Sequence, residues 1–429
     1  MQRQYQPDLA SQLILPDELI IEIMTWLPVK PLMQFKCVNK IFKTRISNPD
    51  FVQMHLNKSS QNPHLALMWK HDFHSRTFEQ FSVITFPISL LLQNMYTRLH
   101  FFRPNFDSPQ WLGRDENTTL RCNPYYRLDE NYHTWWVVGS CNGLLCLIDV
   151  QCSGYNDWPR EYYWLYLWNP ATRTKSRRTS LSFPSNFKFS FGYDISSKTY
   201  KVVAFRVDLD KERGNATSVV KVFNMADNSR RNIQCFPVLP LYWFKREKNN
   251  GVYLSGTINW MTLRDYFYSD YEIGNVSSIT VEQYVIVSLD LSTESYTELL
   301  LPRGFDEVSC VQPTLVVLIN CLCFCHDFKG SHLVLWKMTD FGVQESWIQL
   351  FKISYENFHS SEYLLKFETM ELLPLYLSKN AETLIFANDE NDTTFIYNCR
   401  DNRGEQIRIT NKIWWLWAKD YVESLVPTR

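Results

Sequence analysis

The sequence predicts an α+β protein that is mostly β, with a small N-terminal three-helix block followed by a β-propeller-like domain. Helical spacing of apolar residues is confined to residues 13–57. Beyond them come short β-branched and aromatic runs bounded by Asn, Asp, Gly and Ser, which is typical of strands and turns. A strand-and-turn unit recurs there about every 50 to 60 residues, the length of a four-stranded blade plus its loop, which leaves room for about six blades.

The N-terminal block carries clear helix signals. Pro16 suits the first position of a helix, and Asp17 and Glu18 complement the positive end of its dipole. Pro28 ends this helix and Pro31 begins the next. The apolar stripes are Leu19, Ile20, Ile23 and Leu27; then Leu32, Phe35 and Val38; then Ile41, Phe42 and Ile46. Because about 40 residues seldom bury enough surface to fold alone, we expect a partner to cover part of this block.

The same block resembles an F-box. The matching segments follow the order of the family: Leu15-Pro16-Asp17-Glu18-Leu19, Leu27-Pro28-Val29-Lys30, Phe35-Lys36-Cys37-Val38, Asn48-Pro49-Asp50-Phe51 and His55-Leu56. Two residues depart from the pattern, because Asn39 stands where plant members often carry Cys and Phe42 where they usually carry Trp. Phe42 keeps an aromatic anchor but is smaller and lacks the N–H of Trp, two losses that favour weaker adaptor binding.

This resemblance implies a docking function. An F-box binds the Skp subunit of a Skp–cullin–F-box ubiquitin ligase, and through Skp the cullin, so the chain would be the substrate-recognition subunit. The residues that match the pattern forming and supporting that interface are Leu15, Pro16, Leu19, Ile23, Leu27, Pro28, Val29, Leu32, Phe35, Val38 and Phe42.

The remainder of the chain is predicted to be all-β. We expect residues 1–12 to be a flexible N-terminus, 13–57 the F-box, 58–64 a polar linker and 65–429 the β domain. Strand-like runs occupy residues 135–138, 144–148, 163–168, 201–205, 219–223, 284–289, 315–319, 333–336 and 394–397. One recurring unit ends an apolar strand in a polar turn at Asn169, Asn224, Asp290, Lys337 and Asn398.

This β region resembles the F-box-associated domain of plant F-box proteins, the group that includes F-box/kelch-repeat and S-locus F-box-like proteins. The matching stretches lie, in order, at residues 139–146, 168–173, 191–194, 200–203, 256–260, 342–347 and 421–426. Asn320 replaces a family Gly, a swap that a turn tolerates. Kelch repeats carry a double glycine that this sequence lacks, so the propeller architecture is better supported than the kelch label.

Composition and charge narrow the partners and the compartment. The 44 basic and 45 acidic residues leave a net charge of −1, which provides no global field for nucleic acid or an anionic membrane. The first residues lack the apolar core of a signal peptide, and no apolar run is long enough to span a bilayer. An odd count of 11 cysteines, mostly in apolar runs, suits reduced thiols. We therefore expect the protein in the cytoplasm, the nucleus or both.

Three constellations could carry chemistry, and each has a plainer interpretation. Cys321, Cys323, Cys325 and His326 suggest zinc, but alternate thiols on one apolar strand are more typical of a core. Asp327, His326 and Ser331 suggest a hydrolase triad, yet no nucleophile elbow or phosphate-binding loop accompanies them. The basic run at residues 173–178 favours a solvated turn. We therefore predict no catalytic residues, no metal and no cofactor.

Aromatic clusters at residues 135–136, 162–164 and 414–417 are expected to fill the space between blades. Tyr266, Phe267 and Tyr268 lie beside acidic residues in a predicted loop and are weak candidates for substrate binding. Two other functions remain open: a small-molecule-binding or hydrolytic propeller, and a duplicated receptor that no longer binds its adaptor.

Overall fold

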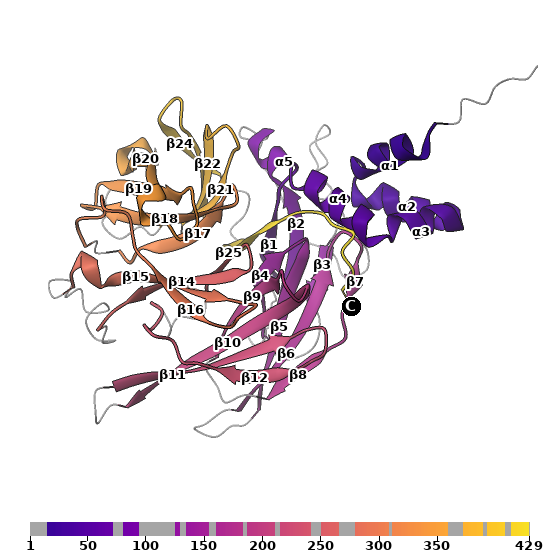
Figure 1. Cartoon of the computed structure of the whole chain (residues 1–429). Coiled ribbons are helices and arrows are strands. Elements are labelled where there is room, and N and C mark those ends of the chain that lie inside the picture. The colour runs from indigo at the N-terminus through magenta and orange to yellow at the C-terminus, as the bar shows by residue number, and fades with distance from the viewer. Residues whose placement is uncertain are drawn as a thin grey trace, which may run out of the picture.

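The computed structural model describes residues 15–71, 80–93, 125–128, 134–153, 160–182, 187–210, 215–241, 250–265, 279–308, 311–358, 372–388, 393–407 and 413–428. Helices come first, and strands make up most of the described residues after residue 63 (Figure 1). Within these ranges no helix has the length and apolar character needed to cross a bilayer. The predicted flexible segment 1–12 lies outside the described residues.

The F-box region has four helices, where the apolar stripes predicted three. They are α1 (Asp17–Thr25), α2 (Val29–Val38), α3 (Lys40–Ile46) and α4 (Pro49–Ser59). Asn48 separates the last two because its side chain accepts the Asp50 N–H at 2.7 Å, and Pro49 takes the first helical position. The predicted linker 58–64 is shorter in the structure. Helix α4 includes its first two residues, and the first strand begins at its last residue, His64.

The strands in the described ranges form six sheets, one for each blade of a propeller. The first blade combines β25 (Ile413–Tyr421), β1 (His64–His71), β2 (Gln80–Pro87) and β3 (Tyr125–Leu128), with α5 (Ile88–Gln93) after β2. The second holds β4 (Thr134–Cys141), β5 (Leu144–Ser153), β6 (Arg160–Asn169), β7 (Thr174–Lys175) and β8 (Thr179–Ser182). The third holds β9 (Lys188–Asp194), β10 (Thr199–Asp210), β11 (Asn215–Asn224) and β12 (Arg230–Ile233).

The last three blades repeat this plan. The fourth holds β13 (Val252–Leu254), β14 (Thr257–Leu263), β15 (Tyr284–Asp290) and β16 (Tyr296–Leu299). The fifth holds β17 (Thr314–Leu318), β18 (Cys321–Phe328), β19 (His332–Met338) and β20 (Trp347–Ser354). The sixth holds β21 (Leu372–Leu377), β22 (Thr383–Asn388), β23 (Thr393–Asn398) and β24 (Arg403–Ile407). Short 3₁₀ turns lie at Val281–Gln283, Gln344–Ser346 and Tyr355–Asn357.

The inner strands close into a ring. Strands β25, β4, β9, β13, β17 and β21 contact one another in that circular order. The first sheet is built from both ends of the β domain, because β25 pairs antiparallel with β1 and brings Tyr421 opposite His64. The end of β25 therefore emerges beside helix α4, which directly precedes β1 (Figure 1).

The predicted strands and repeat are confirmed. Every predicted strand run overlaps an observed strand, and the polar turn residues of the repeat lie at or next to the end of the third strand in blades two to six. Some members of the predicted aromatic clusters pack between blades, as expected, whereas Trp164 stacks with Arg178 of its own blade. The rings of Trp136 on β4 and Trp417 on β25 lie 6.2 Å apart, and both side chains are buried.

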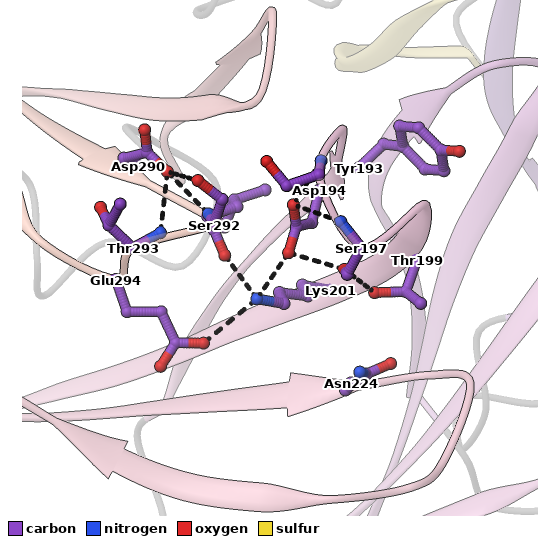
Figure 2. A network of polar contacts seen from close by, with 12 residues as sticks. Tyr193, Asp194, Ser197, Thr199, Lys201, Asn224, Asp290, Ser292, Thr293 and Glu294 are labelled. Carbon is purple, nitrogen blue, oxygen red and sulfur yellow. Dashed lines mark hydrogen bonds and ion pairs between the residues drawn. The ribbon is translucent and has the colours of Figure 1, made fainter.

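A buried ion network braces blades three and four (Figure 2). The Lys201 ammonium on β10 lies 2.9 Å from the Asp194 carboxylate and 3.2 Å from the Glu294 carboxylate, and it also donates to the Leu291 carbonyl. Desolvation by burial acts to raise the pKa of Asp194, but hydrogen bonds from Ser197 and Lys201 outweigh it and leave that pKa below its usual value. The pKa of Glu294 is lowered by the same balance, with Arg231 and Lys201 as the donors.

Candidate functional site: an apolar face on the helical block

The helical block leaves a large part of its apolar surface in solvent. Leu15 lies just before α1, and Leu19 and Ile23 lie in its first and second turns. Their exposed fractions are 52%, 50% and 53%, and we call these three residues the α1 stripe. Phe35, Val38, Ile41 and Phe42 form a second surface, the α2–α3 patch, in which the rings of Phe35 and Phe42 lie 5.7 Å apart. In this patch Val38 is 68% exposed and Ile41 is 62% exposed. Apolar surfaces of this kind usually mark an interface.

These side chains remain outside because the other side of the helices is already packed. Met24, Val29, Leu32, Ile46 and Phe51 form a small helical core, which also includes Leu425 from the far end of the β domain. Leu19 and Ile23 therefore lie on the outward face of α1, whose inward face already packs in the helical core. Ion pairs between Arg45 and Asp17, and between Lys58 and Glu22 at 3.1 Å, tie α1 to α3 and α4.

The predicted adaptor-binding residues divide into three groups by burial. Val29 and Leu32 are fully buried in the helical core, so they support the face and do not form it. Leu27 and Phe42 are half-buried. The exposed members are Leu15, Pro16, Leu19, Ile23, Pro28, Phe35 and Val38.

Sequence reasoning missed some exposed apolar residues of this block. Trp26 is 55% exposed, with its indole N–H donating to Glu22 at 3.1 Å and the Lys58 ammonium 4.0 Å from its ring centre. Ile41 belongs to a predicted helical stripe but not to the predicted interface, and Met54 belongs to neither. Trp26 directly precedes Leu27 yet lies outside the F-box motif, so the motif gives no signal for it.

The two departures from the F-box pattern are compatible with a well-formed block. Asn39 has an extended backbone, with φ −154° and ψ 167°, and its side chain accepts the Phe42 N–H at 2.8 Å. It is therefore the N-cap of α3, a function for which Asn is among the preferred residues. Phe42 packs partly against the helical core and partly against Phe35.

We expect Asn39→Ala to destabilise the block by about 1 kcal/mol, because the first turn of α3 loses its cap. Faster amide exchange at Phe42 and Lys43 would report this loss directly. Asn39→Ser is the matched control, since Ser also caps helices and should restore most of the protection. Equal exchange in the Ala and Ser variants would contradict the capping function.

The constellations considered for chemistry have structural partners. Cys323 and Cys325 lie in the core between blades five and six, and burial raises the pKa of the Cys323 thiol to about 12. His326 receives the Trp336 indole N–H at its Nε2 and contacts the Asp327 carbonyl through Nδ1. In the ranges that the structure covers, no group of three or more His, Cys, Asp or Glu side chains is placed to hold a metal ion.

The supposed triad is not assembled as a relay. The Asp327 carboxylate accepts from the Tyr355 hydroxyl at 2.7 Å and from the Gly330 N–H at 2.9 Å, while the His326 ring bonds elsewhere. The Ser331 hydroxyl donates to the Phe328 carbonyl. Each of these side chains therefore holds the β18–β19 hairpin in shape.

The basic run lies along its own blade. The Arg178 guanidinium stacks 3.6 Å from the Trp164 ring centre and lies 3.3 Å from the Asp149 carboxylate. The Lys175 ammonium lies 3.8 Å from the Tyr166 ring centre. Tyr266, Phe267 and Tyr268, the weak substrate-binding candidates, lie outside the described residues.

Fold and site together define a class of protein: a six-bladed β-propeller preceded by a four-helix block that keeps an apolar face in solvent. Family comparison agrees with that division. Residues 13–54 match the F-box domain, and residues 95–428 match the F-box associated β-propeller domain. The chain therefore belongs to the F-box proteins with an F-box associated β-propeller domain.

Two curated proteins of Arabidopsis thaliana are similar to this chain. An F-box/kelch-repeat protein is 27% identical over 360 residues, covering 79% of this chain and 79% of that protein. The F-box protein CPR1 is 23% identical over 359 residues, covering 79% of this chain and 73% of that protein. Among solved structures, a protein of unknown function from Desulfotomaculum acetoxidans aligns with a TM-score of 0.37 and 10% identity, over 82% of this chain and 96% of that one.

Proposed function

We propose that this protein is the substrate-recognition subunit of a Skp–cullin–F-box ubiquitin ligase. The observation that carries the proposal is the apolar surface of the F-box, where the α1 stripe and the α2–α3 patch stay in solvent although the helices have a core of their own. A Skp-type adaptor is the partner that an F-box implies, and an apolar partner surface would remove these side chains from water.

The proposed mechanism is positional. The F-box would attach the chain to the ligase, and the propeller would hold a protein target through loops on a rigid scaffold. Holding the target near a charged ubiquitin-conjugating enzyme raises its effective concentration, so this chain need supply no catalytic residue and no cofactor. A ligase of this kind would act in the cytoplasm, the nucleus or both.

Capture by an immobilised Skp adaptor tests the proposal. We expect the full chain to be retained and the double variant Leu27→Ala, Pro28→Ala to be lost. Leu27 is half-buried and its carbonyl lies 2.9 Å from the His55 ring, while Pro28 precedes α2, so this change weakens both the surface and its support. Failure of the unmodified protein to bind, or unchanged retention of the variant, would count against an adaptor interface at the F-box.

A further inference from the structure

The segment after β25 connects the propeller to the F-box. Residues 422–428, which we call the strap, run from the end of β25 past helix α4 (Figure 1). Leu425 is 4% exposed and is part of the helical core with Val29, Leu32 and Phe51. The Glu423 carboxylate accepts the Val29 N–H at 3.3 Å, at the first residue of α2. The strap thus contributes both an apolar side chain and a hydrogen-bond acceptor to the F-box.

The opposite side of the strap is fixed to blade two. The fully buried Asn169 amide donates to the Ser424 carbonyl at 3.0 Å and to the Val426 carbonyl at 2.8 Å. The Tyr421 hydroxyl accepts the Ala171 N–H at 3.2 Å. Gly143 has φ +75°, and a Cβ there would lie 2.6 Å from the Val422 carbonyl, so this turn leaves just enough room for the strap.

These two sets of contacts have a common origin. The strap can reach the F-box only when β25 is paired with β1, because that pairing places Tyr421 opposite His64 at the start of the β domain. The helical block is too small to bury much apolar surface alone, and one of its buried core residues belongs to the strap. Closure of the propeller ring and completion of the F-box core therefore use two consecutive stretches of chain, β25 and the strap.

From this we infer that the strap makes the F-box conditional on a closed propeller: it completes the helical core and fixes the orientation of the helices relative to the blades. Leu425 and Asn169 are positioning residues in this arrangement. Its functional meaning rests on the proposed ligase function, since a fixed F-box orientation sets where a bound target lies relative to the adaptor. The stabilising contacts themselves do not depend on that function.

Hydrogen exchange on the full chain tests the inference. Leu425→Ala is expected to accelerate exchange in α2 and α4 by about 10-fold or more, because it opens a cavity in a small core. Leu300→Ala is the matched control, since Leu300 is 48% exposed and lies outside the helical core. Strands β14 and β15 should keep their protection in both variants. Unchanged exchange in α2 and α4, or an equal loss in helices and in β14 and β15, would overturn the inference.

A second variant and an adaptor measurement separate the two proposals. Removing residues 422–429 keeps β25 and should accelerate exchange in α2 and α4 at least as much as Leu425→Ala does. The affinity of Leu425→Ala for a Skp adaptor should fall only in proportion to the fraction of molecules whose helices are ordered, because the ordered block is the form that binds. If the unmodified chain does not bind the adaptor but the exchange results are as expected, the ligase proposal is wrong and the inference about the strap is supported. If binding occurs and the exchange effects are absent, the inference about the strap is wrong and the ligase proposal is supported.

Discussion

Ile23→Asp is expected to reduce the affinity for a Skp adaptor by about 100-fold or more, which corresponds to about 2.8 kcal/mol. Ile23 is 53% exposed in the α1 stripe, so the new carboxylate is hydrated in the free protein and must be desolvated only when an apolar partner covers it. Because the desolvation free energy destabilises the complex and not the free protein, the melting temperature of the free protein should change little. Titration calorimetry and thermal denaturation of the same sample would measure both quantities.

Ile348→Asp is the matched control for this substitution. Ile348 is 45% exposed and lies on β20, the outer strand of blade five, which Figure 1 shows far from the F-box helices. The Ile348→Asp variant introduces the same charge at similar exposure, so its adaptor binding should equal that of the unmodified protein. Equal losses in the two variants would mean that added charge acts non-specifically, and full affinity in Ile23→Asp would remove the α1 stripe from the interface.

Lys201→Met should destabilise the propeller by about 3–5 kcal/mol at neutral pH. The substitution leaves Asp194 buried without its ion-pair partner at 2.9 Å, and Glu294 keeps only its contact with Arg231. The loss should be large because the buried Asp194 carboxylate loses its charged partner and retains its desolvation cost, while the hydrogen bonds from Ser196 and Ser197 that remain come from neutral groups. Denaturant titration followed by tryptophan fluorescence would measure it. Lys329→Met removes a surface pair with Glu307 at 3.5 Å and should cost less than about 1 kcal/mol.

Acid should reduce the difference between Lys201→Met and the unmodified protein. The pKa values of Asp194 and Glu294 are lower in the folded protein than their ordinary values. Such carboxylates stabilise the fold above their unfolded pKa, near 4, and that contribution is lost as the pH falls through the folded pKa. The difference in stability should therefore begin to shrink as the pH falls below about 4, and it should vanish only once the pH lies below the lowered folded pKa values of Asp194 and Glu294. A difference that does not shrink with falling pH would show that packing of the lysine stem, and not its charge, is what matters.

Much of the fold could be predicted because its signals are local. The strand runs and the polar turns at Asn169, Asn224 and Asp290 depend on residues next to one another, so local pattern located these strand ends. That each strand is the third of its blade came from the structure. The fourth F-box helix also has a local signal in Asn48 and Pro49, which cap and begin it. The apolar stripes alone do not separate it from α3, because a stripe marks a face and not the point where one helix ends and the next begins.

The sequence by itself determined that Leu19 and Ile23, one helical turn apart, share a face. The other two residues of that predicted stripe, Ile20 and Leu27, pack against the helical core. The sequence did not determine what covers each face, because periodicity contains no information about contacts distant in the chain. Only the tertiary structure decided that Val29 and Leu32 are buried while Val38 is exposed, and that Leu425 completes the helical core. The physical reason is ring closure, since pairing of β25 with β1 brings the strap to the F-box.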